Sequence, residues 1–290
     1  MFKALDKRWL ALIVLMLGDL MIVLDSTVVN IALPSIRADL GFTETSLVWV
    51  VNAYLLTFGG FLLLGGRLGD IFGARRVLLI GLALFTFASL VCGLANSREM
   101  LVIARAIQGI GGAVVSAVAL SLIMNLFTEE RERVRAMALF GFVMAGGGIV
   151  GVLLGGVLTG AINWNSIFLI NIPIGIAVMI LCWKLLPHSK RENQPAHLDI
   201  AGATTVTVSL LLAVYAIVNG NAAGWLSMET LSLLGAAFIL FAAFLWIESR
   251  VKAPLMPLHI FRNRNLSTAN VAVMFWAACI SGTWLALTTP

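Results

Sequence analysis

The chain has 290 residues, of which 60% are apolar and 11% charged, and its mean hydropathy is +1.01. This composition excludes a water-soluble globular domain. The formal net charge is +5, but no nucleic-acid interface is expected, because the basic residues are scattered over short loops and not gathered on one solvated face. The sequence therefore predicts an all-α protein, a polytopic transmembrane helical bundle whose surroundings are the lipid bilayer.

Long apolar runs follow one another along the whole chain. A helix needs about 20 mostly apolar residues to cross the hydrocarbon core of a bilayer. The first run is too long for the apolar part of a signal peptide and lacks a small-residue cleavage site, so we expect it to remain in the mature protein. The predicted spans are 9–33, 47–66, 76–95, 101–126, 136–160, 166–186, 199–219, 229–248 and 266–288.

The loops between these spans differ sharply in basic residues. With the N-terminus in the cytoplasm, sixteen Lys and Arg residues lie in cytoplasmic segments, whereas Arg37 and Arg98 lie outside and Arg105 lies within a span. Cytoplasmic loops of membrane proteins carry such an excess. The pattern predicts a cytoplasmic N-terminus and explains the net charge as a topology signal.

Two loops, 186–198 and 249–265, are longer and more polar than the others. They divide the predicted spans into groups of six, two and one. The last span runs to Pro290 with no polar tail, and a lone ninth helix has no bundle partners of its own. We therefore expect the chain to be truncated within a longer protein.

Three ionisable residues, Asp19, Asp25 and Arg105, lie inside predicted spans and are the candidate residues for proton coupling or substrate binding. Each costs at least a few kcal/mol to insert, and so needs a reason to be there. Asp19 and Asp25 are six residues apart, about 600° around a helix, so they face different directions and form no carboxylate dyad.

Burial and a nearby cation can together tune a carboxyl group to titrate near neutral pH, as proton coupling requires. Arginine stays charged, so Arg105 can serve as the partner of an acid or as an anchor for backbone carbonyls. The alternative is structural: Asp25 would brace a helix break with Ser26 and Thr27, and Arg105 would be a fixed ion.

Glycine is concentrated in two places. Gly66, Gly69 and Gly73 lie in the connection between the second and third spans and permit a tight backbone turn. There, Asp70 is surrounded in sequence by arginines and could form a charge latch across the cytoplasmic face; an ordinary basic loop with a glycine turn is the alternative. These arginines are Arg67, Arg75 and Arg76.

The fifth span carries the second group of glycines, which let helices approach closely and bend. A small-residue packing stripe is the simpler reading of the same pattern. The glycines are Gly146, Gly147, Gly148, Gly151, Gly155, Gly156 and Gly160.

Several motifs together resemble one family. The segment 24–34, LDSTVVNIALP, is similar to the first-helix signature of the fourteen-helix drug:proton antiporters of the major facilitator superfamily. Segment 66–76 resembles the cytoplasmic loop motif of that superfamily, and segment 101–113 resembles its fourth-helix motif. Further matches occur at 171–175, 198–202 and 254–270, so the resemblance covers essentially the whole chain.

This resemblance implies an architecture. Residues 1–186 would form an N-terminal six-helix bundle, residues 187–250 a two-helix linker insert, and residues 251–290 a cytoplasmic loop and the first helix of an incomplete C-terminal bundle. In such folds the substrate site lies near the bilayer midplane, between two halves that rock in alternation. The implied partners are protons, a small amphipathic substrate and the missing C-terminal half, in a bacterial inner membrane.

The resemblance also implies roles for single residues. Asp25 would be the proton-responsive acid, Arg105 would tune it, and Asp70 with its arginine neighbours would stabilise one conformational state. Tyr54, Phe58 and Gln108 would line the substrate path. Gly147–Gly156 resembles the antiporter motif of exporters, but Val152 replaces its proline, so we expect a less sharply kinked helix.

Functions other than drug export are also compatible with the sequence. The alternatives are uptake or metabolite transport by a protein of the same fold, and an inactive fragment of such a transporter. A membrane-embedded enzyme would need a Ser/His, two-Asp or metal constellation within the spans, but His188, His197 and His259 all lie in predicted loops. We expect no enzyme activity, no metal and no cofactor.

Overall fold

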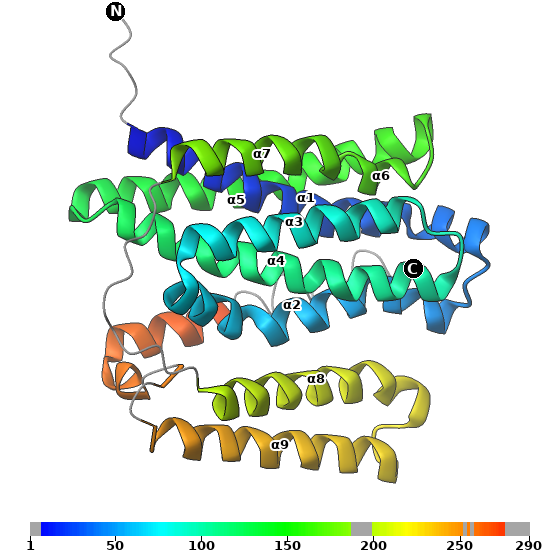
Figure 1. Ribbon diagram of the computed structural model, residues 1–290. Coiled ribbons are helices and arrows are strands. Elements are labelled where there is room, and N and C mark those ends of the chain that lie inside the picture. The colour runs from blue at the N-terminus through cyan, green and yellow to red at the C-terminus, as the bar shows by residue number, and fades with distance from the viewer. Residues whose placement is uncertain (1–6, 187–198, 252–253, 256–257, 276–290) are drawn as a thin grey trace, which may run out of the picture.

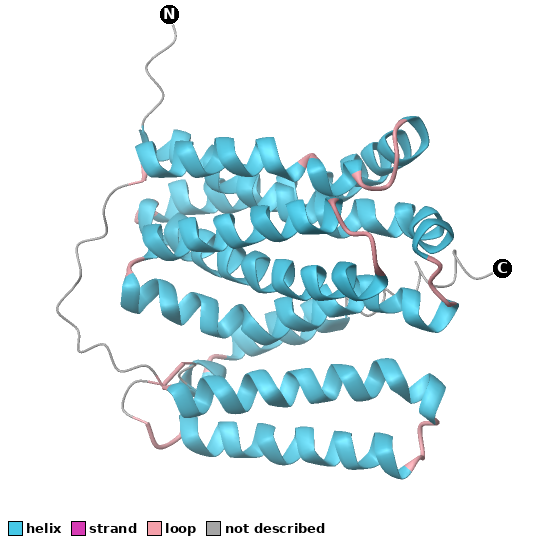
Figure 2. Cartoon of the chain, turned by 45° about the vertical axis from the view of Figure 1, so that its right-hand side comes forward, coloured by secondary structure: helices cyan, strands magenta, loops and turns pink. Residues whose placement is uncertain are grey.

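The computed structural model describes residues 7–186, 199–251, 254–255 and 258–275, and the secondary structure in these ranges is entirely helical (Figures 1 and 2). Eight helices of this part are long and apolar enough to cross a membrane, when α6 and α7 are taken together. The elements are α1 Lys7–Leu40, α2 Glu44–Phe72, α3 Ala74–Gly93, α4 Arg98–Leu126, α5 Glu130–Ala161, α6 Ser166–Leu169, α7 Asn171–Leu185, α8 Ile200–Ala223, α9 Met228–Glu248 and η1 Leu258–Arg262.

The first eight predicted spans are confirmed as helices. Of the ninth, predicted at 266–288, residues up to 275 are helical and the rest lie outside the described residues, as do His188, His197 and Cys279. The first two helices are longer than predicted. The helix α1 continues through Pro34 and ends at Gly41, whose φ of 67° suits glycine at a helix C-terminus.

The connection between α2 and α3 is shorter than the sequence suggested. It consists of Gly73 alone, with φ 94°, whereas residues 66–72 complete α2 and residues 74–76 begin α3. Gly66 and Gly69 therefore lie within α2, and their placement in the connection is wrong. The close approach expected of these glycines is present at Gly69, where a Cβ would lie 2.9 Å from Val118 of α4.

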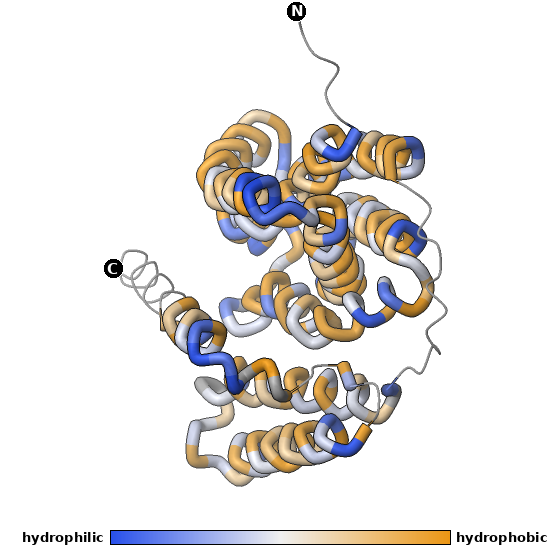
Figure 3. The backbone as a smooth tube through the Cα atoms, turned by 90° about the vertical axis from the view of Figure 1, so that its left-hand side faces the viewer, coloured by the Kyte–Doolittle hydropathy of each residue, from blue (hydrophilic) through white to orange (hydrophobic). Residues whose placement is uncertain are grey.

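The helices α1 to α7 form one bundle, and α8 and α9 form an antiparallel hairpin beside α2 (Figure 1). Within the bundle α2 and α3 pack on α4, and α1 packs on α5 and α7. Hydrophobic residues follow the lengths of the helices, and most hydrophilic ones lie at their ends (Figure 3). Large apolar side chains such as Ile80 and Phe142 are exposed, as expected of a surface that faces lipid.

The glycines of α5 lie on two faces. Gly147, Gly151 and Gly155 are buried against α1: a Cβ on Gly147 would lie 2.7 Å from Leu20, and one on Gly151 would collide with Thr27. Five others would meet no described atom within 4 Å, and these are Gly141, Gly146, Gly148, Gly156 and Gly160. Close contact with α1 therefore explains only the first three, and α5 itself runs unbroken through Val152.

This division of the α5 glycines predicts opposite effects of one substitution. Gly151→Leu forces atoms into the α1–α5 contact and should lower the free energy of unfolding by about 1–3 kcal/mol, the usual cost of overpacking. Gly148→Leu, the matched control, should leave stability unchanged or raise it, because leucine favours helix more than glycine does. Thermal unfolding in detergent would measure both, and equal losses would contradict the assigned faces.

Candidate functional site

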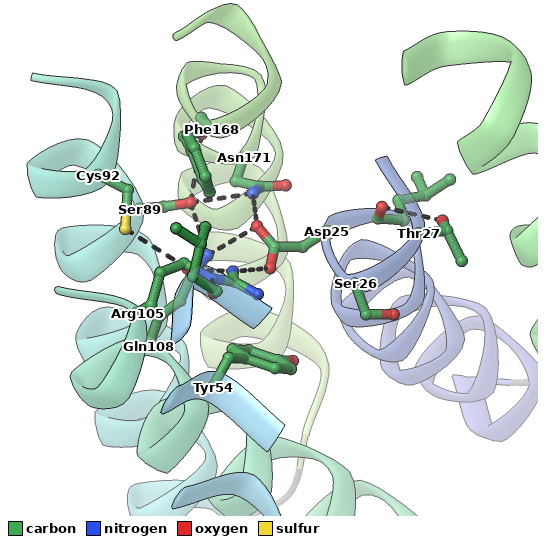
Figure 4. A network of polar contacts seen from close by, with 12 residues as sticks. Asp25, Ser26, Thr27, Tyr54, Ser89, Cys92, Arg105, Gln108, Phe168 and Asn171 are labelled. Carbon is green, nitrogen blue, oxygen red and sulfur yellow. Dashed lines mark hydrogen bonds and ion pairs between the residues drawn. The ribbon is translucent and has the colours of Figure 1, made fainter. Parts of the chain in front are cut away.

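A cluster of polar side chains lies in the interior of the bundle (Figure 4). Its members come from α1, α2, α3, α4 and α7, and each is at most 2% exposed. Polar groups buried so completely in a membrane protein are costly and mark functional positions. The members are Asp25, Tyr54, Ser89, Cys92, Arg105, Gln108 and Asn171.

The centre of the cluster is an ion pair between α1 and α4. The Arg105 guanidinium donates to Asp25 Oδ2 at 2.5 Å, and its Nε donates to the carbonyl of Val50 at 3.0 Å. The guanidinium also lies over the rings of Tyr54 and Phe168, 4.2 and 5.7 Å from their centroids. Arg105 is thus a charged group fixed in place by contacts from α1, α2 and α6.

Asp25 is held equally firmly through its second oxygen. Oδ1 accepts hydrogen bonds from Gln108 at 2.8 Å and from Asn171 at 3.0 Å. Both amides also donate to the hydroxyl of Ser89, each at 2.9 Å. Both carboxylate oxygens therefore accept hydrogen bonds. The network around this one acid joins α1 to α3, α4 and α7.

The structural alternative for Asp25, a helix break braced by its neighbours, is wrong. The helix α1 is continuous there, and the hydroxyls of Ser26 and Thr27 bond back to the carbonyl of Val23, each at 2.9 Å. Their polarity is satisfied within one turn of the helix. This leaves the carboxylate of Asp25 to face the interior.

Asp19 occupies a separate position, as its spacing from Asp25 predicted. It is fully buried, and its Oδ1 accepts a hydrogen bond of 2.6 Å from Ser116 of α4. Its Oδ2 has no hydrogen-bond partner among the described residues. The two acids of α1 thus meet α4 at different levels and with different partners.

The predicted lining residues lie at or next to this site. Gln108 belongs to the polar cluster, and Tyr54 is buried with its ring stacked on Phe58 at 5.8 Å. The close approach of α2 to α4 here requires Gly109, since a Cβ there would collide with Thr57 and with the carbonyl of Tyr54. The glycine spacing of segment 101–113 therefore has a packing cause.

The charge cluster expected around Asp70 is formed only in part. Asp70 lies on the exposed end of α2, 3.9 Å from Arg67. Arg75 is buried and donates instead to the carbonyl of Trp183 near the end of α7, and Arg76 is exposed.

The sequence did not indicate two members of the network, Ser89, which accepts hydrogen bonds from both amides, and Asn171, which donates to Asp25. Neither was given a role, although Asn171 opens one of the recognised motifs. The available signal was a polar residue inside an apolar run, which is weaker than a charge. Among the described residues no group of His, Cys, Asp and Glu could hold a metal ion, and Cys92 and Cys182 are free thiols.

A bundle of membrane-length helices with a buried carboxylate and arginine at its centre is the construction of an integral membrane transporter. The chain matches the model of the Major Facilitator Superfamily over residues 15–289 and belongs to that superfamily. Membership of this superfamily favours a part of a transporter over an enzyme.

Curated relatives carry names of drug resistance and export. The chain is 41% identical over 258 residues to the puromycin resistance protein pur8 of Streptomyces alboniger, covering 89% of this chain and 51% of the relative. It is 40% identical over 280 residues to the cephamycin export protein CmcT of Amycolatopsis lactamdurans, covering 96% of this chain and 58% of the relative. The chain thus spans about half the length of these relatives.

Solved structures give the same fold at low sequence identity. The POT family transporter PepTSo superposes with a TM-score of 0.61 at 15% identity, covering 84% of this chain and 52% of that one. The human organic anion transporter MFSD10 superposes with a TM-score of 0.58 at 18% identity, covering 72% and 55%. These likenesses establish the fold and do not bear on the substrate.

The donors to Asp25 lead to a prediction on stability. Asn171→Ala removes hydrogen bonds to Asp25 and Ser89 in the dry interior and should lower the free energy of unfolding by about 1–3 kcal/mol. Asn30→Ala, which removes an exposed amide bonded to the carbonyl of Ser26, should cost less than about 0.5 kcal/mol. Denaturant unfolding in detergent compares the two, and equal costs would show that the buried network adds no stability.

Proposed function

We propose that this chain supplies the N-terminal half of a proton-coupled exporter of small amphipathic or cationic compounds, of the fourteen-helix drug:proton antiporter type. The buried pair of Asp25 and Arg105 carries the proposal, because it places a titratable acid against a permanent cation inside the bundle. The export names of the relatives support the direction of transport.

Coupling would follow from the charge of Asp25. While Asp25 is ionised, Arg105 is compensated and the amides of Gln108 and Asn171 donate to the carboxylate. A proton on Asp25 removes this compensation and leaves Arg105 as a buried, unpaired charge, which is strongly unfavourable. The helices that meet at the site would then rearrange, so that proton uptake is linked to the movement of one half against the other.

Other predicted residues take supporting roles in this proposal. Asp70 with Arg67 would stabilise one conformation at the cytoplasmic ends of α2 and α3. Tyr54 and Phe58 would become part of the substrate path when the bundle opens. The open glycine face of α5, which includes Gly156, would lie where the second half of the transporter approaches.

Efflux of a lipophilic cation from inverted or intact vesicles tests the proposal. The chain extended through the rest of its reading frame should export the cation in proportion to the proton gradient, whereas the 290-residue form should not. Asp25→Asn in the extended form should abolish gradient-driven efflux at unchanged expression, because a neutral amide cannot exchange a proton.

Glu44→Gln is the matched control, since Glu44 is an acid of α2 with an 80% exposed side chain. It should retain full efflux. Efflux that persists in Asp25→Asn, or that does not respond to collapse of the gradient, would refute proton coupling through Asp25.

The proposed orientation, with the N-terminus in the cytoplasm, can be checked separately. Asn96 lies exposed between α3 and α4, and Thr128 lies exposed between α4 and α5. In a cysteine-free background, Asn96→Cys should react with a membrane-impermeant maleimide in intact cells. Thr128→Cys should react only after permeabilisation, and the reverse pattern would invert the topology.

A further inference from the structure

The two buried acids of α1 differ in how their charge is compensated. Asp25 has Arg105 at 2.5 Å and two amide donors. Asp19 is just as buried, but among the described residues no Lys, Arg or His forms an ion pair with it, and only its Oδ1 has a hydrogen-bond donor. An isolated buried carboxylate is far costlier than a neutral acid. The pairing of Arg105 with Asp25 therefore leaves Asp19 in need of a neutralising partner.

The surroundings of Asp19 offer no charged partner of their own. The residues next to it on α1 face apolar groups: a Cβ on Gly18 would lie 3.6 Å from Val178 of α7 and 3.8 Å from Leu82 of α3, and Leu20 faces Gly147 of α5. On α4, Ser116 donates a hydrogen bond to Asp19.

Tyr54 links the two acids. Its ring lies against Arg105, and its hydroxyl, which has no hydrogen-bond partner in the described part of the chain, lies next to Gly112. Gly112 is one helical turn before Ser116, so it lies on the same face of α4. The unpartnered oxygens of Tyr54 and Asp19 are therefore directed to neighbouring levels of one helix face.

We propose that Asp19, with Ser116 and Tyr54, forms a second proton-binding site, distinct from the Asp25–Arg105 pair and occupied while that pair is intact. Asp19 is 0% exposed. Binding of a proton forms one O–H bond at Oδ2 and takes the charge of Asp19 from −1 to 0. The protonated Oδ2 then carries an O–H group that can donate a hydrogen bond.

This inference deepens the proposed function. If the chain acts in proton antiport, α1 carries two proton sites in different states: Asp25 ionised against Arg105, and Asp19 protonated against Ser116. Tyr54 extends along α4 from the first site toward the second, because its ring lies against Arg105 and its hydroxyl lies next to Gly112, one helical turn before Ser116. The protonation of Asp19 itself can be measured without substrate and without transport.

Infrared spectroscopy of the purified chain in lipid at neutral pH tests the site. Exposed carboxylates are ionised under these conditions, so a carbonyl stretching band of a protonated carboxylic acid reports a buried neutral acid. We expect this band in the unaltered protein and its loss in Asp19→Asn. Ser116→Ala, which removes the hydrogen bond to Oδ1 and changes little else, should keep the band and shift it to higher frequency.

Ser89→Ala is the matched control, because Ser89 is a buried serine of the Asp25 network. It should leave the band in place. Absence of the band from the unaltered protein, its persistence in Asp19→Asn, or a shift caused by Ser89→Ala and not by Ser116→Ala would overturn the proposal. Failure of drug efflux with the band intact would instead count against the proposed function alone.

Discussion

The burial of one arginine in the membrane is the constraint on which the rest of the bundle depends. Arg105 cannot lose its charge, and it lies 1% exposed among helices that face lipid. It is tolerable there because Asp25 supplies the opposite charge and a backbone carbonyl and two aromatic rings occupy its other sides. These partners come from α1, α2 and α6, and the hydrogen bonds to Asp25 add α4 and α7. One charge thus fixes how most of the bundle's helices must meet.

The same constraint suggests how a bundle of this kind can work as a transporter. Inside the bundle, binding of a proton can change the charge of a buried group. Each such change of charge requires the polar groups around it to rearrange. With Asp25 paired to Arg105 and Asp19 unpaired, the first helix carries one acid suited to the ionised form and one suited to the neutral form. We propose that the two halves alternate when Asp25 and Asp19 exchange their ionised and neutral states.

Much of the fold could be predicted from the sequence because bilayer thickness sets a ruler for apolar runs. The spans and the separate directions of Asp19 and Asp25 needed only composition and helical geometry. The ends of α1 and α2 could not be predicted, since Pro34 and Gly69 usually interrupt helices and their tolerance here depends on packing. The partners of Asp25 were predicted in part: Arg105 is conspicuous as a charge, whereas Asn171 is an ordinary polar residue until α7 brings it to the carboxylate. Ser89 likewise shows no signal in the sequence, and it joins the network only through the amides of Gln108 and Asn171. The bond of Arg75 to the carbonyl of Trp183 could not be predicted, because it depends on how α3 packs on α7.

The central claim is that Asp25 and Arg105 compensate each other's buried charge. A double-mutant cycle on unfolding in detergent tests it most directly. Asp25→Asn and Arg105→Gln should each lower the free energy of unfolding by about 3–5 kcal/mol, because each leaves a buried partner uncompensated. The double variant should lose clearly less than the sum of the two, since it contains neither unpaired charge. Strictly additive losses would contradict the account.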